Sequence, residues 1–332
     1  MKIALLKRHL YGIGGLEKQT RCIAKAFTDH GCSVTLISND TPQNYDHRPL
    51  TSFDRSSLQA FDITLGIDRL PYQSHIRAGN GVHAAYLQTK GWISKLLPKH
   101  RQELALERAA LLEPSLRHII TNSEMVRREY IEHYGVDENK VTALHNGVEW
   151  KALEKPYLER LEKSAGPYHF LFVGNDLKRK GLMPLLHALS NLTQHDWKLT
   201  VVGSDKRLNA FQTLAKALGI YPHIHFAGKQ PDVYPYYAAA DCLVLPSFYD
   251  PFANVTIEAL AAGLHVITSP TNGGSEVLTA ATGQIVSEPK ALCQALENAI
   301  SLPKKPAVCR ASVQHLDFDT QLKTFVNLCL ST

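Results

Sequence analysis

The chain lacks several features that would assign it to a common class of protein. No apolar run approaches the roughly 20 residues needed to span a bilayer, and the first residues, MKIALLKRHLYGIGG, lack the longer apolar region of a signal peptide. Six cysteines occur in 332 residues and none is spaced as CxxC. We therefore expect reduced, buried thiols in a cytoplasmic protein, without a disulfide framework or a zinc site.

The sequence also lacks a strong excess of charge of either sign. Its net charge is +5, and charged residues make up 20% of the chain. Proteins that bind nucleic acid usually carry a stronger basic stripe, so we expect no nucleic-acid partner. A length of 332 residues with 44% hydrophobic side chains suits two globular domains, each with its own core.

Apolar runs and helical patterns alternate from one end of the chain to the other. Strands are predicted in the first half over 2–6, 33–38, 62–67, 118–123 and 140–145. The pattern then starts again, with strands predicted over 168–174, 198–204, 223–228, 242–247 and 265–270. Such alternation is typical of parallel sheets covered by helices on both faces. The predicted fold is therefore α/β, with two Rossmann-like, doubly wound domains facing a cleft.

A polar segment, 151–167, ends in Gly-Pro and is the expected linker. We assign 1–160 to the first domain, together with a C-terminal helix over 315–332 that packs back on it. The second domain is then 161–314. Ligands of doubly wound sheets bind outside the carboxyl ends of the strands, so two substrates would meet between the domains.

The first motif is YGIGGLEKQ, which follows the first predicted strand. Gly14 and Gly15 let the backbone pass close to a ligand, and the following helix N-terminus favours an anion such as phosphate. As a dinucleotide fingerprint the motif is a weak match to GxGxxG, because the third glycine is missing. A tight turn without a ligand is the alternative.

The second motif is FVGNDLKRKGL, Phe172 to Leu182. Lys178, Arg179 and Lys180 lie between a strand end and a helix start, where cations are unfavourable unless an anion is present. A pyrophosphate would supply that anion, with the planar Arg179 and the compact Lys180 as complementary donors. The alternative is a solvated basic turn.

The third motif is PSFYDPFANVTIEALAAGLHVITSP, Pro246 to Pro270. The backbone N–H groups between Phe252 and Val255 open a helix and offer a second phosphate seat. Asp250 precedes that seat, and Glu258 lies about two turns further on, where its carboxylate could bind a pair of ribose hydroxyls. Alternatively, Asp250 only caps the helix and Glu258 is only solvated.

The order of these motifs resembles family 4 of the glycosyltransferases. The resemblance rests on the GG turn, Asn146-Gly147, VGxxxxRKG, VVG, FAG and PSxxxPFxxxxxEAxAxGxxVIxxxxxGG, and it is strongest over 168–276. Within the family the chain is most similar to lipopolysaccharide core glucosyltransferases that extend a heptose. The resemblance implies the two-domain GT-B fold and a retaining enzyme that uses a nucleotide-sugar donor. It makes 1–160 the acceptor-side domain and 161–314 the nucleotide-sugar domain.

The resemblance also implies roles for individual residues. Arg179 and Lys180 would hold the donor diphosphate, Glu258 the ribose, and Asp250 would lie near the donor sugar. The remaining positions that it places around the donor are Gly14, Gly15, Gly228, Lys229, Asn254 and Val255. Asp250 departs from the family, which usually has the longer glutamate there.

Two further features lie in the first half of the chain. His83 follows Gly79-Asn80-Gly81 and is a candidate to orient the donor sugar; a structural histidine is the alternative. In segment 90–101, apolar residues interleave with lysines and an arginine, a composition typical of a peripheral membrane surface. An ordinary amphipathic helix packed on the core is equally consistent with it.

The chain's cations make a metal unnecessary for neutralising the leaving group. The DxD sequence at 317–319 lies far from the other motifs, and we interpret it as helix capping. The predicted function is transfer of a sugar, glucose, from a UDP-linked donor to a lipid-linked saccharide such as lipopolysaccharide core. No cofactor or metal is expected, and the protein would be cytoplasmic, peripheral on the membrane face. Rival hypotheses are a nucleotide-sugar epimerase, an NAD-dependent oxidoreductase and an inactive sugar-binding subunit.

Overall fold

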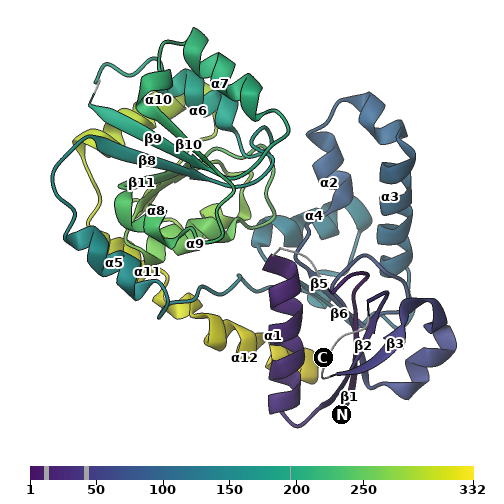
Figure 1. Ribbon diagram of the computed structural model, residues 1–332. Helices are drawn as coiled ribbons and strands as arrows, with labels where there is room; N and C mark the ends of the chain where they lie inside the picture. The colour runs from purple at the N-terminus through teal and green to yellow at the C-terminus, as the bar shows by residue number, and fades with distance from the viewer. Residues whose placement is uncertain (11–14, 41–44, 195) are drawn as a thin grey trace. The chain divides into compact units, whose positions relative to one another are not determined.

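The computed structural model describes residues 1–10, 15–40, 45–194 and 196–332. The chain divides into two compact units: unit 1 comprises 1–145 and 319–332, and unit 2 comprises 146–318. Each unit contains one parallel sheet with helices on both faces (Figure 1). The predicted α/β class with two Rossmann-like domains is confirmed.

Unit 1 contains a seven-stranded sheet in the order β3-β2-β1-β4-β5-β6-β7. The strands are β1 (Lys2–Leu6), β2 (Ser33–Ser38), β3 (Asp46–Pro49), β4 (Ile63–Gly66), β5 (His75–Ala78), β6 (His118–Thr121) and β7 (Val141–Ala143). The helices are α1 (Gly15–Asp29), α2 (His83–Gln88), α3 (Pro98–Leu111), α4 (Glu124–Tyr134) and α12 (Phe318–Ser331).

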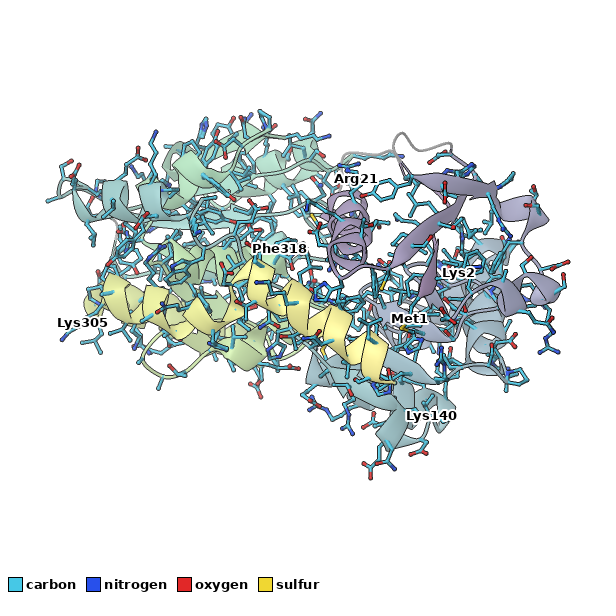
Figure 2. All side chains as sticks on the ribbon, turned by 90° about the horizontal axis from the view of Figure 1, so that it is seen from below. Met1, Lys2, Arg21, Lys140, Lys305 and Phe318 are labelled. Carbon is cyan, nitrogen blue, oxygen red and sulfur yellow. The ribbon has the colours of Figure 1, made fainter. Side chains whose placement is uncertain are left out.

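The C-terminal helix α12 completes the core of unit 1. Phe325 and Val326 of α12 lie in one apolar cluster with Ile3 and Leu5 of β1 and Phe27 of α1. Figure 2 shows α12 starting at Phe318, and its buried residues share this apolar cluster with α1. Helix α12 therefore helps to cover one face of the unit 1 sheet, although β1 lies at the opposite end of the sequence.

Unit 2 contains a six-stranded sheet in the order β10-β9-β8-β11-β12-β13. The strands are β8 (Tyr168–Val173), β9 (Trp197–Val202), β10 (Ile224–Gly228), β11 (Cys242–Leu245), β12 (His265–Thr268) and β13 (Gly283–Ile285). The helices are α5 (Glu154–Leu161), α6 (Leu182–Leu189), α7 (Leu208–Ala217), α8 (Tyr234–Ala239), α9 (Asn254–Ala261), α10 (Pro289–Ser301) and α11 (Pro306–Ser312).

Strand β8 shows how this sheet is buried on both faces. Successive side chains of a strand point to opposite faces. Phe170 and Phe172 accordingly join the cluster beneath α6, α7 and α10, whereas Leu171 and Val173 join the cluster beneath α8, α9 and α11. A strand that must be apolar on both faces has a continuous hydrophobic sequence, which is why YHFLFV is recognisable as a strand from the sequence alone.

The expected linker, 151–167, lies within unit 2 and does not connect the two units. It contains α5, which belongs to unit 2 because Arg160 bonds to the carbonyls of Ala240 and Gly263 and to the carboxylate of Asp241. The sequence does not predict that this helix packs on unit 2, because a charged residue, Arg160, rather than an apolar one contributes to its attachment. The change between units instead falls between His145 and Asn146.

Candidate functional site

The predicted cationic and acidic motifs of the second half meet at one point of the unit 2 sheet. The strand order runs outward from β8 in one direction and from β11 in the other, so the topology switches between these two neighbours. Doubly wound sheets bind ligands at this switch, outside the carboxyl ends of the strands. The loop that follows β8 carries Arg179 and Lys180, and the loop that follows β11 carries Asp250.

The loop after β8 is held in a fixed shape by its own residues. Asp176 adopts a left-handed backbone conformation with φ of 55°, accepts from the amide of Lys180 through its carbonyl, and accepts from the amide of Arg179 through its side chain. Its carboxylate also pairs with the side chains of Arg179 and Arg207, at 3.4 and 3.3 Å. This anchoring role of Asp176 is not predicted from the sequence.

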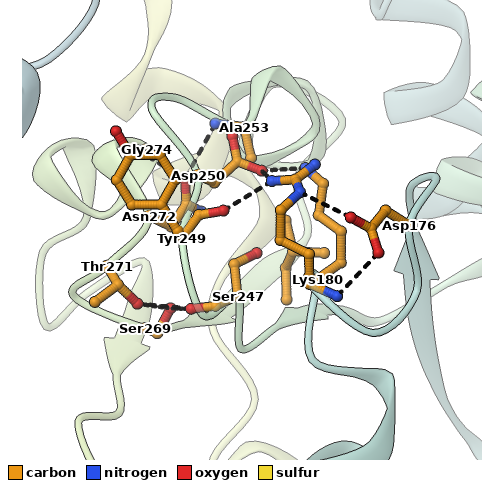
Figure 3. Close-up of polar contacts among 12 residues, drawn as sticks. Asp176, Lys180, Ser247, Tyr249, Asp250, Ala253, Ser269, Thr271, Asn272 and Gly274 are labelled. Atoms are coloured by element: carbon orange, nitrogen blue, oxygen red, sulfur yellow. Dashed lines mark hydrogen bonds and ion pairs between the residues drawn. The ribbon is translucent and has the colours of Figure 1, made fainter. Parts of the chain in front are cut away.

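Arg179 and Lys180 converge on a single carboxylate oxygen (Figure 3). Nη1 of Arg179 donates to Oδ2 of Asp250 at 3.2 Å and to the carbonyl of Tyr249 at 2.7 Å, and Nζ of Lys180 donates to the same Oδ2. Asp250 is only 6% exposed. The two cations are thus fixed next to each other by partners on both loops, as a binding site for an anion requires.

The backbone around Asp250 is fixed as firmly as its side chain. Its amide donates to the carbonyl of Thr271, and its carbonyl accepts from the amide of Gly273. Asn272, fully buried between these residues, accepts from the amides of Ala253 and Gly274 and donates to two threonine hydroxyls. Asn272 therefore connects the loop after β11 to the loop after β12, a second role that the sequence does not predict.

Helix α9 starts directly after this connection. Ala253 precedes its first residue, Asn254, whose side chain accepts from Nδ2 of Asn146 at 2.7 Å, and Val255 follows, half-buried. The first N–H groups of a helix have no carbonyl partner within the helix and carry the positive end of its dipole. The N-terminus of α9 thus offers backbone hydrogen-bond donors in addition to the side chains of Arg179 and Lys180.

Glu258 lies on the same face of α9 as Asn254, one turn further along the helix. Its Oε2 accepts a 2.7 Å hydrogen bond from the hydroxyl of Tyr237 on α8. Burial and the nearby Glu258 carboxylate raise the pKa of Tyr237 well above its usual value, so the hydroxyl stays protonated and remains a donor. The alternative that Glu258 is merely a solvated helix residue is wrong, because its carboxylate is fixed by a buried partner.

Comparison with known proteins assigns the chain to a family. A family model of glycosyl transferases group 1 matches residues 154–315, and one of glycosyltransferase family 4 matches residues 59–150. The chain belongs to these glycosyltransferases. The resemblance to glycosyltransferase family 4 that the sequence motifs indicate is thereby confirmed.

Individual relatives agree with this assignment. The lipopolysaccharide glucosyltransferase WaaG of Escherichia coli K12 is 28% identical over 244 residues, which make up 69% of this chain and 64% of WaaG. Glycogen synthase of Mycobacterium tuberculosis is 30% identical over 242 residues, 70% of this chain and 56% of that enzyme. The matched part of the chain thus spans less than two thirds of either relative.

Solved structures show the fold. The crystal structure of WaaG superposes with a TM-score of 0.74 at 22% identity and covers 98% of this chain and 95% of WaaG. The Anabaena protein Alr3699/HepE, in complex with UDP-glucose, superposes with a TM-score of 0.75 at 15% identity and full coverage of both chains. The glycosyltransferase fold is therefore GT-B, with two Rossmann-like domains.

Within this glycosyltransferase, Gly228 and Lys229 lie at the carboxyl end of β10. The carbonyl of Gly228 accepts from the amide of Gly203 at the end of β9. Gly203 has a φ of 137°, and a Cβ there would lie 2.0 Å from the carbonyl oxygen of Gly174, at the end of β8. The ends of three neighbouring strands therefore meet through glycine backbone, and Lys229 follows, exposed to solvent.

The remaining predicted site residues belong to unit 1. Gly14 lies outside the described residues, and Gly15 is the first residue of α1. His83 starts α2, where its amide donates to Glu107, and its Nε2 lies 3.1 Å from Nδ1 of His100. Burial, together with the charge of Arg69, lowers the pKa of His83, so the ring is neutral at pH 7.

No helix among the described residues is long and apolar enough to cross a membrane. Groups of three or more side chains able to hold a metal ion are also absent from the part of the chain that the structure describes. Of the DxD sequence, Asp317 immediately precedes α12 and Asp319 lies in its first turn. These two carboxylates therefore lie at a helix start.

Proposed function

We propose that this glycosyltransferase is a retaining enzyme that transfers glucose from UDP-glucose to a saccharide on a lipid carrier, such as lipopolysaccharide core. The observation that carries the proposal is the joint fixation of Arg179 and Lys180 on Asp250 at the topological switch of unit 2. The choice of donor draws on the UDP-glucose complex of Alr3699/HepE, and the choice of acceptor on the name of WaaG.

In this proposal each side chain has a separate task toward the donor. Arg179 and Lys180 bind the diphosphate together with the first amides of α9, those of Asn254 and Val255. Glu258 binds the ribose, and Gly228 and Lys229 lie near the base. Asp250 lies near the transferred sugar. Contacts of Gly14, Gly15 and His83 with the donor remain predictions from the sequence.

The proposed reaction follows from where charge develops. The bond between the sugar's anomeric carbon and the β-phosphate oxygen breaks, and UDP leaves with an additional negative charge. A bond forms between that carbon and the acceptor oxygen on the same face, and the acceptor proton passes to the leaving phosphate. Arg179, Lys180 and the positive end of α9 are already positioned to stabilise the new charge, which is the most effective use of fixed donors.

Nucleotide binding tests the proposal first. Calorimetry with UDP, GDP and NAD should show preferential binding of UDP to the wild type, and Arg179→Ala should weaken it at least tenfold because a charge-assisted contact is lost. Turnover of UDP-glucose should persist in EDTA, and NMR of the product should show retained anomeric configuration. Binding of NAD alone, unaffected by Arg179→Ala, would instead support an oxidoreductase.

Product analysis separates the remaining rivals. An epimerase of the same fold would release free sugar and would not extend an acceptor. An inactive sugar-binding subunit would bind UDP-glucose without consuming it. Formation of a glycoside from UDP-glucose and a truncated lipopolysaccharide would contradict both.

We propose further that segment 90–101 places the enzyme on the cytoplasmic face of the membrane. Trp92 is 73% exposed, and Ile93, Leu96 and Leu97 are also largely exposed in the short 3-10 helix and just before α3. The cations of the segment alternate with them in the sequence, and no acidic residue lies between 88 and 102. Apolar side chains beside cations suit an anionic bilayer surface, where each basic residue contributes about 1 kcal/mol.

Vesicle binding tests this surface. Replacing both Trp92 and Leu96 with serine should reduce binding to vesicles containing anionic phosphatidylglycerol at least tenfold, because two inserted apolar side chains are lost. Leu302→Ser, which removes a side chain that is 69% exposed in unit 2, is the matched control and should leave binding unchanged. Equal binding by all three proteins would contradict the membrane proposal.

A further inference from the structure

Tyr237 is the largest fully buried side chain among the described residues, and its hydroxyl is a polar group within an apolar cluster. Its ring packs among apolar residues on the α8–α9 face of the unit 2 sheet, where these two helices lie side by side (Figure 1). Within the described residues, the hydroxyl donates to Oε2 of Glu258 at 2.7 Å. A phenylalanine would fill the same apolar space without any polar atom to satisfy.

From this contact we infer that Tyr237 is a positioning residue that orients the Glu258 carboxylate toward the ribose of the donor. The inference rests on the proposed function, since it requires a nucleotide at unit 2. It adds a residue from α8, a helix that none of the motifs identified in the sequence contains.

The geometry of α9 supports this role. Glu258 is four residues from Asn254, the first residue of the helix, so it lies about 6 Å along the helix axis from the amides proposed to bind phosphate. That separation suits the distance between a diphosphate and the ribose hydroxyls of one nucleotide. The side chain of Glu258 is half-buried, so its carboxylate can meet a ligand while Tyr237 holds it from the core side.

A tyrosine hydroxyl suits this purpose better than a cation. It fixes one carboxylate oxygen without neutralising the charge, and each carboxylate oxygen can accept more than one hydrogen bond. The core fixes the ring of Tyr237, so the direction of its O–H bond is confined to the neighbourhood of Glu258. The carboxylate therefore meets the ribose with its rotation already restricted, which lowers the entropic cost of binding.

The experiment compares UDP with 2′,3′-dideoxy-UDP by calorimetry. The wild type should bind UDP about tenfold more tightly than the dideoxy nucleotide, because the hydrogen bonds between a carboxylate and the ribose hydroxyls contribute about a factor of ten in affinity. In Tyr237→Phe this preference should fall to about threefold or less, while affinity for the dideoxy nucleotide stays unchanged. A residue with only a structural role would weaken both nucleotides together.

Tyr234→Phe is the matched control. Tyr234 lies on the same helix and near the same carboxylate, but no hydrogen bond of its hydroxyl occurs within the described residues. Tyr234→Phe should keep the tenfold preference for UDP. In a Glu258→Gln background, adding Tyr237→Phe should not reduce this preference further. A wild-type preference that persists in Tyr237→Phe, or failure of that variant to fold, overturns the inference alone. Absence of UDP binding by the wild type would overturn the proposed function as well.

Discussion

Replacing Lys180 with alanine is expected to lower turnover about 10²- to 10³-fold, the usual cost of removing one fixed donor from developing negative charge. Nζ of Lys180 shares Oδ2 of Asp250 with Arg179, so the ammonium is fixed before the leaving group forms. The variant also leaves Asp250 with Arg179 as its remaining cationic partner in this cluster. Steady-state rates with UDP-glucose and an acceptor, together with a thermal unfolding curve, separate lost catalysis from lost stability.

Lys178→Ala is the control for this prediction. Lys178 has the same charge and lies two residues earlier in the same loop, but its side chain is exposed to solvent. Removing it should change turnover less than about twofold, because an exposed charge is screened by water and salt. Equal losses in the two variants would mean that the loop acts through its overall charge rather than through the position of Lys180.

The residues of this cluster are predictable from the sequence only in part. Arg179 and Lys180 are identifiable because cations at a helix start require an anion, and Asp250 because it precedes a second helix start. Their direct contact is not predictable, since 70 residues separate Lys180 from Asp250. The same holds for Tyr237, whose apolar setting is evident in the sequence but whose partner, Glu258, is known only from the packing of α8 on the core.

The fold shows a similar division. Strands that are buried on both faces, such as β8 and β11, are predicted correctly from their apolar runs. Strand β3 is missed because it is the edge strand DHRP and pairs with β2 through its backbone while its side chains stay largely exposed. Strand β5, HIRA, is missed because two of its four buried residues are His75 and Arg77, side chains that are usually exposed.

Burial of Arg77 has a structural explanation. Its guanidinium lies 5.6 Å from the ring centroid of Phe325 on α12, and burial lowers its pKa to about 10. The residue therefore remains charged at neutral pH and contributes to the attachment of α12 to the core. The tertiary contact with α12, a helix from the opposite end of the chain, makes this polar strand possible.

Gly181→Ala is expected to have the largest effect on stability, because Gly181 lies where the two loops of the candidate site approach each other closely through their backbones. It has a φ of +86°, and a Cβ would lie 2.0 Å from the carbonyl oxygen of Pro246 in the loop after β11. Left-handed backbone strain alone costs roughly 1–2 kcal/mol for a residue with a side chain. The clash with a backbone atom adds to this, so we expect a loss of about 3 kcal/mol or more in urea unfolding, within the range known for overpacking.

Gly219→Ala separates the two causes. Gly219 lies in the same unit and has a φ of +74°, but no atom lies within 4 Å of the position that a Cβ would take there. It should therefore lose only the roughly 1–2 kcal/mol of backbone strain and keep normal UDP affinity. Gly181→Ala should also weaken UDP binding, because relieving the clash moves the loop that carries Lys180 away from the loop that carries Asp250. Equal effects of the two variants on stability and binding would show that the close approach of the loops at Pro246 is not required for the site.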